Sequence, residues 1–157
     1  MLLRLDRIFS TPGAFLPIEE TFSPEWEELA PFSLTEPVQL SGRVENKAGV
    51  VTVKFQLSST LSALCDRCLE PVSIPVSLQA ARILTRSDSE TAEEEGYLAV
   101  PNGCLNTQEL ARCEIILNLP SRVLCQENCR GLCPVCGVNR NQTVCGCLTE
   151  EETDNSR

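Results

Sequence analysis

The amino-acid sequence predicts an α+β protein, in which an antiparallel β-sheet meander, open or barrel-like, carries one packed helix and is followed by an irregular cysteine-rich module. Three observations predict this class. Apolar and polar residues alternate through most of 38–84, one segment near 107–118 has helical spacing, and six of the ten cysteines fall within 125–147. The expected regions are an N-terminal strand with an acidic extension (1–37), a sheet-and-helix core (38–120), the cysteine-rich module (121–148) and an acidic disordered tail (149–157).

The first 37 residues are predicted to contribute one strand and a polar surface. Residues 2–8 hold enough apolar side chains for a short strand, and prolines interrupt the stretch after them. Charged runs in such stretches are usually solvated. We therefore interpret five acidic residues there as exposed surface: Glu19, Glu20, Glu25, Glu27 and Glu28.

The central segment has the period-two pattern of half-buried antiparallel strands. The alternating runs are 38–44, 51–65 and 72–80, which predict a meander of at least three strands. Along 51–61 the odd positions, including Val53 and Phe55, should be buried and the even positions exposed. An acidic loop at 86–96 and a short closing strand at 97–101 are expected to follow.

The segment near 107–118 is predicted to form the helix that packs on the sheet. Thr107 is the expected N-cap, and Glu109 lies in the first turn, where a carboxylate interacts favourably with the helix dipole. Pro120 ends the segment, because proline cannot continue a helix. The predicted apolar stripe consists of Leu110, Cys113, Ile116 and Leu117.

Charge and composition exclude several functions. The chain has 22 acidic and 13 basic side chains, a formal charge of −9, and no histidine. The negative charge disfavours non-specific nucleic-acid binding, which depends on contacts of Lys and Arg with phosphates, and it is compatible with a basic protein partner. Without histidine, a His base or a Cys–His dyad is excluded, and cysteine and carboxylate remain as metal ligands.

The N-terminal apolar run is interrupted at Arg4, which makes it too short for a signal-peptide core. No apolar stretch approaches the ~20 residues that span a bilayer. We therefore expect a cytoplasmic protein, or a protein of the plastid stroma if the source bears plastids, with no membrane association. Thiols stay reduced in these compartments, so a cysteine cluster indicates metal more often than disulfides.

Eight of the cysteines fall in four close pairs, which predict one or two structural zinc ions held by thiolates. The sharpest signal is C-P-V-C-G at 133–137, because two thiolates two residues apart can bind one tetrahedral ion from a tight turn. The predicted ligands are Cys65, Cys68, Cys125, Cys129, Cys133, Cys136, Cys145 and Cys147. Cys104 and Cys113 stand alone and are expected to be buried, inert thiols.

Two combinations of these pairs are compatible with the spacing. The pairs 133/136 and 145/147 lie within fifteen residues, so one site can close cheaply and leave 65/68 to combine with 125/129. The competing arrangement joins 65/68 to 133/136 and leaves the other two pairs together. Because loop-closure entropy grows slowly with length, sequence distance favours the first arrangement only modestly.

Redox catalysis and iron–sulfur ligation are the alternatives to structural zinc. A redox C-x-x-C normally begins a helix, whose dipole lowers the thiol pKa, and neither 65–68 nor 133–136 leads into a helical pattern. Four cysteines can also hold an iron–sulfur cluster. Segment 121–157 has few large apolar residues. A structural zinc, which contributes ~10–16 kcal/mol in finger peptides, would offset much of its ordering entropy.

Three stretches together resemble the YceD family, also called the large ribosomal RNA subunit accumulation protein family: C-D-R-C-L-E-P-V, E-I-I-L-N-L-P and C-Q-E-N-C-R-G-L-C-P-V-C-G-V-N-R-N-Q-T-V-C-G-C. The resemblance covers roughly 40–148, and residues 1–37 carry no matching motif. It implies a role in producing or accumulating large-subunit ribosomal RNA, without catalytic residues. Some members lack the C-terminal cysteines, which favours stabilisation over chemistry as the role of a metal.

The leading hypothesis is a non-enzymatic ribosome-biogenesis factor that binds a ribosomal RNA precursor or a basic ribosomal or assembly protein, with no small-molecule substrate. In 121–147 three arginines and one glutamate give a formal charge of +2, but each zinc with four thiolates carries −2. We therefore expect weak direct RNA affinity and a basic protein as the immediate partner. The alternative is a thiol-redox enzyme or metal carrier that uses Cys65 and Cys68, which requires exposed, low-pKa thiols.

Overall fold

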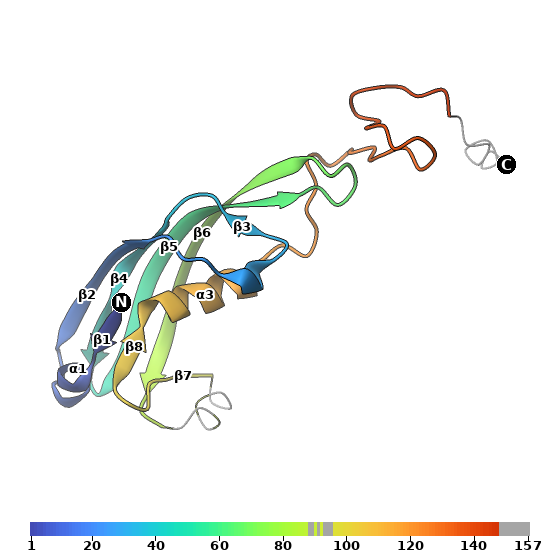
Figure 1. Cartoon of the computed structure of the whole chain (residues 1–157). Coiled ribbons are helices and arrows are strands. Elements are labelled where there is room, and N and C mark those ends of the chain that lie inside the picture. Colours follow the sequence, from blue (N-terminus) through green and yellow to red (C-terminus); the bar gives the residue numbers. More distant parts are fainter. Residues whose placement is uncertain (88–89, 91, 93–95, 148–157) are drawn as a thin grey trace. The chain divides into compact units, whose positions relative to one another are not determined.

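Six strands form the main sheet in the computed structural model of the chain, which describes residues 1–87, 90, 92 and 96–147 (Figure 1). The strand order is β2-β4-β5-β6-β7, and β3 pairs with β5 off this path. The strands are β2 (Phe15–Phe22), β3 (Ser33–Leu34), β4 (Val38–Lys47), β5 (Val50–Leu64), β6 (Pro71–Thr85) and β7 (Leu98–Ala99). A two-stranded antiparallel sheet joins β1 (Leu2–Arg4) to β8 (Cys104–Asn106). The helical elements are α1 (Asp6–Ser10), the 3-10 turn η1 (Glu27–Leu29) and α3 (Thr107–Leu117).

The chain divides into two compact units. The first, the sheet unit, comprises Met1–Leu61 and Ile74–Leu119. The second, the cysteine unit, comprises Ser62–Ser73 and the chain from Pro120 onward. The adjoining ends of β5 and β6, with the turn between them, therefore belong to the cysteine unit.

The predicted meander is confirmed as β4, β5 and β6, which are neighbours in the sheet. β4 and β5 run antiparallel, with Val44 opposite Val53. β2 adds to β4 antiparallel, and β7 adds to β6 in parallel register. Because the ends of the strand order, β2 and β7, are not paired with each other, the sheet is open. The allowance for a barrel is therefore wrong, and the strand expected to close the sheet at 97–101 extends one edge instead.

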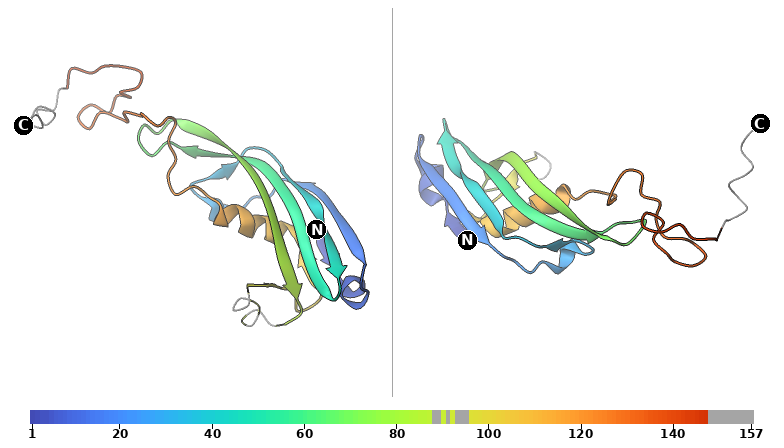
Figure 2. Two further views of the ribbon diagram at one scale, coloured as in Figure 1. Left: turned by 180° about the vertical axis from the view of Figure 1, so that it is seen from behind. Right: turned by 90° about the horizontal axis from the view of Figure 1, so that it is seen from above.

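The alternation along β5 predicts its buried face correctly. The odd positions of 51–61 are all buried, and the even positions are exposed or half-buried. Val53 is fully buried and Phe55 is 4% exposed. These side chains belong to a single apolar cluster of the sheet unit. Figure 1 and Figure 2 show α3 lying across one face of the sheet, and this is the face that the odd positions share.

The helix forms where it is predicted, but its cap and its buried face differ. Asn106, not Thr107, is the N-cap, and its side-chain oxygen accepts hydrogen bonds from the backbone N–H groups of residues 108 and 109. The buried residues are Thr107, Leu110, Ala111, Glu114 and Ile115. Of the predicted stripe only Leu110 is buried, and Leu117 is 74% exposed.

A buried ion pair accounts for the rotated helix face. Glu114 is 5% exposed and faces β6, where Arg82 Nη2 lies 2.8 Å from its Oε1. A charged residue gives no apolar signal, so the periodicity of the sequence pointed to the adjacent face. The expectation that Cys113 is buried is wrong for the same reason: the residue is exposed, and Cys104 is half-buried.

The N-terminal segment is more structured than predicted. The strand expected at 2–8 is shorter, because β1 ends at Arg4 and α1 begins at Asp6. The acidic stretch contains β2, an eight-residue strand paired with β4. Four of its five predicted surface glutamates are exposed, whereas Glu20 is half-buried and accepts a hydrogen bond from the Thr107 hydroxyl.

Candidate metal centres

The first cluster of cysteines combines the β5–β6 turn with the chain after Pro120. Cys65 and Cys68 lie in the turn, and Cys125 and Cys129 lie in the C-terminal segment. The four Sγ atoms all lie within 4.8 Å of one another. The separation between the Cys65 and Cys129 sulfurs is 3.8 Å, and that between the Cys68 and Cys125 sulfurs is 3.5 Å. We call this group centre 1.

Backbone hydrogen bonds join the two segments of centre 1. Asp66 N–H donates to Val123 O at 2.8 Å, and Val123 N–H donates to Asp66 Oδ2 at 2.8 Å. On the other side of the turn, Leu132 N–H donates to Arg67 O at 3.0 Å. The Arg67 guanidinium donates to Cys129 O at 2.9 Å. The turn and the C-terminal segment thus form a paired ribbon whose sulfurs face one point.

A glycine allows the close approach in this ribbon. Gly131 has φ +71°, and a Cβ atom there would lie 2.9 Å from Arg67 O. An L-residue at this position would be strained and would push the two segments apart. The glycine that follows Cys129 by two residues therefore helps to position the fourth sulfur of centre 1.

The second cluster is closed within one stretch of 133–147. Cys133, Cys136, Cys145 and Cys147 place their Sγ atoms within 4.8 Å of one another. Cys133 accepts a hydrogen bond from Gly137 N–H at 2.9 Å and donates its own N–H to Val138 O at 2.8 Å. These bonds fold C-P-V-C-G into a tight turn. We call this group centre 2.

The sulfur geometry fits a tetrahedral ion. Ligands ~2.3 Å from a tetrahedral zinc lie ~3.8 Å apart, and the sulfur pairs of centre 1 are at 3.5 and 3.8 Å. All four ligand positions of each centre are sulfur. A closed set of four thiolates is the donor set of structural zinc and also of some iron–sulfur clusters.

The thiols of each centre have divergent pKa values, because backbone amides stabilise one thiolate while neighbouring sulfurs and burial disfavour another. Burial disfavours the Cys65 thiolate, but the N–H groups of nearby backbone amides outweigh it and lower the Cys65 pKa to about 6. The neighbouring Cys68 sulfur, together with burial, raises the pKa of Cys125 to about 12. In centre 2, backbone amides lower the pKa of Cys133 to about 6, and the Cys136 sulfur raises that of Cys147 to about 11. A cation is needed for all four thiols of a centre to ionise together.

The structure brings together all eight of the predicted cysteines. Their sulfurs group as the first of the two predicted combinations, with 65/68 beside 125/129 and 133/136 beside 145/147. The competing combination, which joins 65/68 to 133/136, is wrong, because the structure places these two pairs in different clusters. Within the described residues, neither C-x-x-C begins a helix, so no helix dipole acts on these thiols.

Sequence reasoning missed the polar residues that surround the cysteines. Asn141 donates to the Cys129 sulfur at 3.2 Å. Asn139 and Gln142 donate to Glu70 Oε1 at 3.2 and 3.0 Å. The repeated asparagine in C-G-V-N-R-N-Q was the available signal, because asparagine between ligand pairs can hydrogen-bond to turns and to sulfur.

A separate polar site lies on the sheet face opposite α3. Both lysines of the chain are there, and Lys54 Nζ and Lys47 Nζ lie 2.6 and 3.2 Å from Glu45 Oε1. Arg43 Nε lies 3.1 Å from Glu45 Oε2. The hydrogen bond from Lys54 is the main cause that lowers the pKa of Glu45 to about 2.

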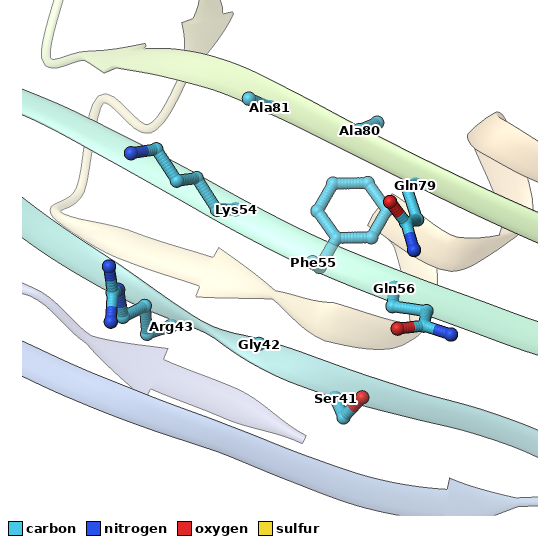
Figure 3. Close-up of a pocket in the computed structure, with 9 residues that line it drawn as sticks. All are labelled: Ser41, Gly42, Arg43, Lys54, Phe55, Gln56, Gln79, Ala80 and Ala81. Carbon is cyan, nitrogen blue, oxygen red and sulfur yellow. The ribbon is translucent and has the colours of Figure 1, made fainter.

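Arg43 and Lys54 also border a shallow hollow of about 660 Å³ on this face (Figure 3). Gly42 adjoins Arg43 on β4 and lies opposite Phe55, and a Cβ atom there would lie 2.7 Å from the Cα atom of Phe55. The missing side chain therefore lets β4 and β5 approach closely. The remaining lining residues are Ser41, Phe55, Gln56, Gln79, Ala80 and Ala81.

The fold and the two cysteine clusters define a cysteine-rich α+β protein with two candidate metal centres. The chain belongs to the YceD family: the family model described as "Large ribosomal RNA subunit accumulation protein YceD" matches residues 53–157. The matched region includes all eight clustered cysteines. It begins within β5, so β2, β3 and the whole of β4 lie outside it together with the N-terminal elements.

The similar curated proteins are uncharacterized mycobacterial proteins. One from Mycobacterium tuberculosis and one from Mycobacterium bovis are each 28% identical to the chain over 144 residues, which is 88% of this chain and 70% of the relative. One from Mycobacterium leprae is 25% identical over 134 residues, 82% of this chain and 62% of the relative. No solved structure matches the chain. In the described part of the chain, no helix is long and apolar enough to cross a membrane.

Proposed function

We propose that the protein is a non-enzymatic ribosome-biogenesis factor that supports the synthesis, processing or accumulation of large-subunit ribosomal RNA. The observation that carries this proposal is the family match over 53–157, which spans both cysteine centres. No arrangement among the described residues argues for catalysis: the acids that are buried, Glu45 and Glu114, are engaged in ion pairs.

The two centres are proposed to hold one structural zinc ion each. Four sulfurs leave no open coordination position for a substrate, which is the mark of a structural site. In the described part of the chain, the buried cluster around centre 1 consists of Cys65, Cys68 and Cys129, and the partly buried apolar residues packed on it are Val72, Leu124 and Leu132. Such a small apolar contribution cannot order the unit, whereas a structural zinc contributes ~10–16 kcal/mol in finger peptides.

The immediate partner is proposed to be a basic ribosomal or assembly protein. The net charge of −9 repels phosphates, and two zinc–thiolate centres keep their surroundings negative. The lysines that could contact RNA phosphates, Lys47 and Lys54, are already paired with Glu45. Direct binding to a ribosomal RNA precursor is the alternative that the partner experiment must distinguish.

The ribosomal role is tested in cells that lack the protein. We expect mature large-subunit ribosomal RNA to fall relative to small-subunit RNA, and expression of the wild-type chain to restore it. A variant with Cys133→Ser and Cys136→Ser should fail to restore it, whereas Cys113→Ser, outside both centres, should succeed. An unchanged ratio of the two RNAs in the depleted cells would rule out the proposal.

The partner is tested by affinity purification at low salt, with and without ribonuclease. A basic protein that stays bound after ribonuclease treatment supports the proposed partner class. Retention of large-subunit RNA by the purified chain alone, with an affinity that falls steeply with salt, would show direct RNA binding instead. In that case Lys47→Ala with Lys54→Ala should weaken binding, and the matched Arg4→Ala control should not.

Burial argues against the rival thiol-redox or metal-carrier function. The depressed pKa of Cys65 would favour reactivity, but its side chain is fully buried, and that of Cys68 is 4% exposed. The zinc proposal therefore predicts slow thiol labelling that a chelator accelerates. Rapid labelling of Cys65 with metal still bound would favour the rival.

A further inference from the structure

Residues 139–142 lie between the ligand pairs of centre 2 yet bond to centre 1. In sequence they separate Cys136 from Cys145. In the structure, Asn141 Nδ2 donates to Cys129 Sγ, a ligand position of centre 1, at 3.2 Å. A loop that is closed by one group of sulfurs therefore supplies a hydrogen bond to a sulfur of the other group.

The Asn141 side chain is held in one orientation by its remaining bonds. Its Oδ1 accepts from Arg130 N–H at 2.8 Å and from the Gln126 side chain at 3.3 Å. Its Nδ2 also donates to Asn139 Oδ1 at 2.9 Å. Both hydrogens of the amide group and its oxygen are thus used, and the N–H that faces Cys129 cannot be exchanged for the oxygen without breaking several bonds.

The position of the 139–142 loop depends in turn on the turn of centre 2. Cys133 N–H donates to Val138 O at 2.8 Å, and Leu132 and Asn139 form an isolated β-bridge. Arg140 N–H donates to Gly131 O at 2.9 Å. These contacts continue directly from the C-P-V-C-G turn. An ion on the four sulfurs of centre 2 would close both ends of this loop.

The same loop also contacts the β5–β6 turn, at Glu70. Asn139 Nδ2 and Gln142 Nε2 both donate to Glu70 Oε1, at 3.2 and 3.0 Å. Glu70 lies two residues after Cys68, and its backbone oxygen accepts from Cys65 N–H at 2.8 Å. The loop therefore contacts both segments that build centre 1.

We propose that Asn141 is a positioning residue that couples the two centres, so that a metal ion bound at centre 2 raises the affinity of centre 1 for its own ion. Ordering of the 139–142 loop presents the Asn141 amide to the Cys129 sulfur, where the N–H stabilises the thiolate. Because coupling between two binding sites is reciprocal, an ion at centre 1 raises the affinity of centre 2 by the same factor. The proposal rests on the metal binding proposed above and is independent of the ribosomal role.

The expected loss of metal affinity at centre 1 follows from other metal sites. There, loss of a hydrogen-bond partner of a ligand typically lowers the metal affinity 10–100-fold. A tetrathiolate centre has a net negative charge, so a neutral N–H donor at one sulfur offsets part of the repulsion. An acidic oxygen at the same place would increase it. The substitution Asn141→Asp should therefore weaken centre 1 more than Asn141→Ala, although it preserves the shape of the side chain.

The test is a titration of the metal-free, reduced full-length chain with Co²⁺, whose thiolate absorption bands report occupancy. Cys133→Ser with Cys136→Ser isolates the spectrum and affinity of centre 1, and Cys65→Ser with Cys68→Ser isolates those of centre 2. With centre 2 intact, Asn141→Ala should weaken centre 1 by about 10–100-fold. Gln39→Ala is the control, because Gln39 is an exposed amide side chain of the sheet unit.

Coupling is read from the double-mutant cycle. When Cys133→Ser with Cys136→Ser removes centre 2, the metal affinity of centre 1 should already be lower than in the wild type. Adding Asn141→Ala to this background should change the affinity of centre 1 by less than about twofold, because the 139–142 loop is no longer positioned there. An equal effect of Asn141→Ala in both backgrounds would show a hydrogen bond without coupling and overturn the proposal. So would Asn141→Ala and Asn141→Asp chains that load like the wild type. Failure of the wild-type chain to bind Co²⁺ would instead reject the metal proposal itself.

Discussion

Different interactions stabilise the sheet unit and the cysteine unit. Nineteen buried apolar residues form one cluster in the sheet unit, and partly buried side chains pack against it. Among the described residues of the cysteine unit, the buried cluster at centre 1 consists of cysteines: Cys65, Cys68 and Cys129. Burial of hydrocarbon can stabilise the first unit in the usual way. The second has little hydrocarbon to bury and depends on its sulfurs.

The local structure of the two units differs accordingly. The sheet unit is built from long hydrogen-bonded strands such as β4 and β5. In the cysteine unit, turns and single hydrogen bonds between side chains and backbone replace regular structure, as between Asp66 and Val123. Loss of one apolar side chain should therefore weaken the sheet unit by degrees, whereas loss of one sulfur should disorder much of the cysteine unit.

The largest effect is expected from a single ligand of centre 2. Cys133→Ser should release the ion of centre 2 and unfold the stretch 133–147 while the sheet unit stays folded, because a structural zinc contributes ~10–16 kcal/mol in finger peptides. Amide hydrogen exchange should show fast exchange through 133–147 and unchanged protection in β4 and β5. Cys113→Ser, at an exposed cysteine outside both centres, is the control. Retained protection in 133–147 of the Cys133→Ser chain would contradict the claim that the cysteine unit depends on its sulfurs.

The next effect concerns the core of the sheet unit. Leu57 is fully buried, and Leu57→Ala should lower the free energy of unfolding by about 2–5 kcal/mol through lost burial and a cavity. Val50→Ala, at a residue that is 50% exposed, should cost less than about 0.5 kcal/mol. Urea denaturation measures both changes, and the metal content of the two variants should equal that of the wild type. A loss of metal in Leu57→Ala would mean that the two units do not depend on separate interactions.

A smaller effect is expected at Glu114, the buried carboxylate of α3. Arg82→Ala leaves Glu114, which is 5% exposed, without its cation. A buried acceptor without a partner costs about 1–3 kcal/mol, and the lower end applies because the Arg82 side chain is itself 41% exposed. Arg4→Ala removes a pair in which both side chains are exposed and should change stability little. Thermal unfolding distinguishes the two variants, and equal midpoints would contradict the role assigned to Glu114.

The smallest effect is a pH dependence confined to the sheet unit. The three cations around Glu45 lower its pKa to about 2, below the ~4.3 of a glutamate in an unfolded chain. The lowered value means that the unfolded chain binds a proton first as pH falls. The contribution of Glu45 is therefore complete above pH ~4.3 and is lost as pH falls toward 2.

The comparison is the stability of Glu45→Gln and of the wild type, measured from pH 5 to pH 2 by urea denaturation. The wild type should lose more stability over this range, and the two curves should approach each other at its acid end. Glu19→Gln, at an exposed glutamate on β2 that pairs with no cation among the described residues, is the control. Parallel curves for Glu45→Gln and the wild type would show that the three cations do not stabilise the carboxylate.

The sequence predicts the elements whose pattern is local. Strict alternation over 51–61 determines the face of β5, because a shift of one residue would turn every apolar side chain to solvent. The spacing of the cysteines predicts which residues form close pairs, but it favours the observed grouping of these pairs only modestly. Both inferences depend on residues whose own chemistry signals their position.

The features missed depend on contacts between distant segments. β2 was missed because Pro17 and two glutamates conceal its alternation, and an edge strand tolerates them because one side of it need not be paired. The buried face of α3 was misplaced because Glu114 becomes buried only through its pairing with Arg82. Asn141 could not be assigned to Cys129, since the fold of the loop between the two positions decides their contact.

The central claim is that two metal ions, each held by four thiolates, organise the cysteine unit. The most direct measurement is elemental analysis of the full-length protein combined with X-ray absorption at the metal edge. The account predicts two zinc ions per chain, each with four sulfur ligands at ~2.3 Å and no light-atom ligand. Iron with visible absorption, a first shell of oxygen or nitrogen, or an ordered cysteine unit without metal would contradict it.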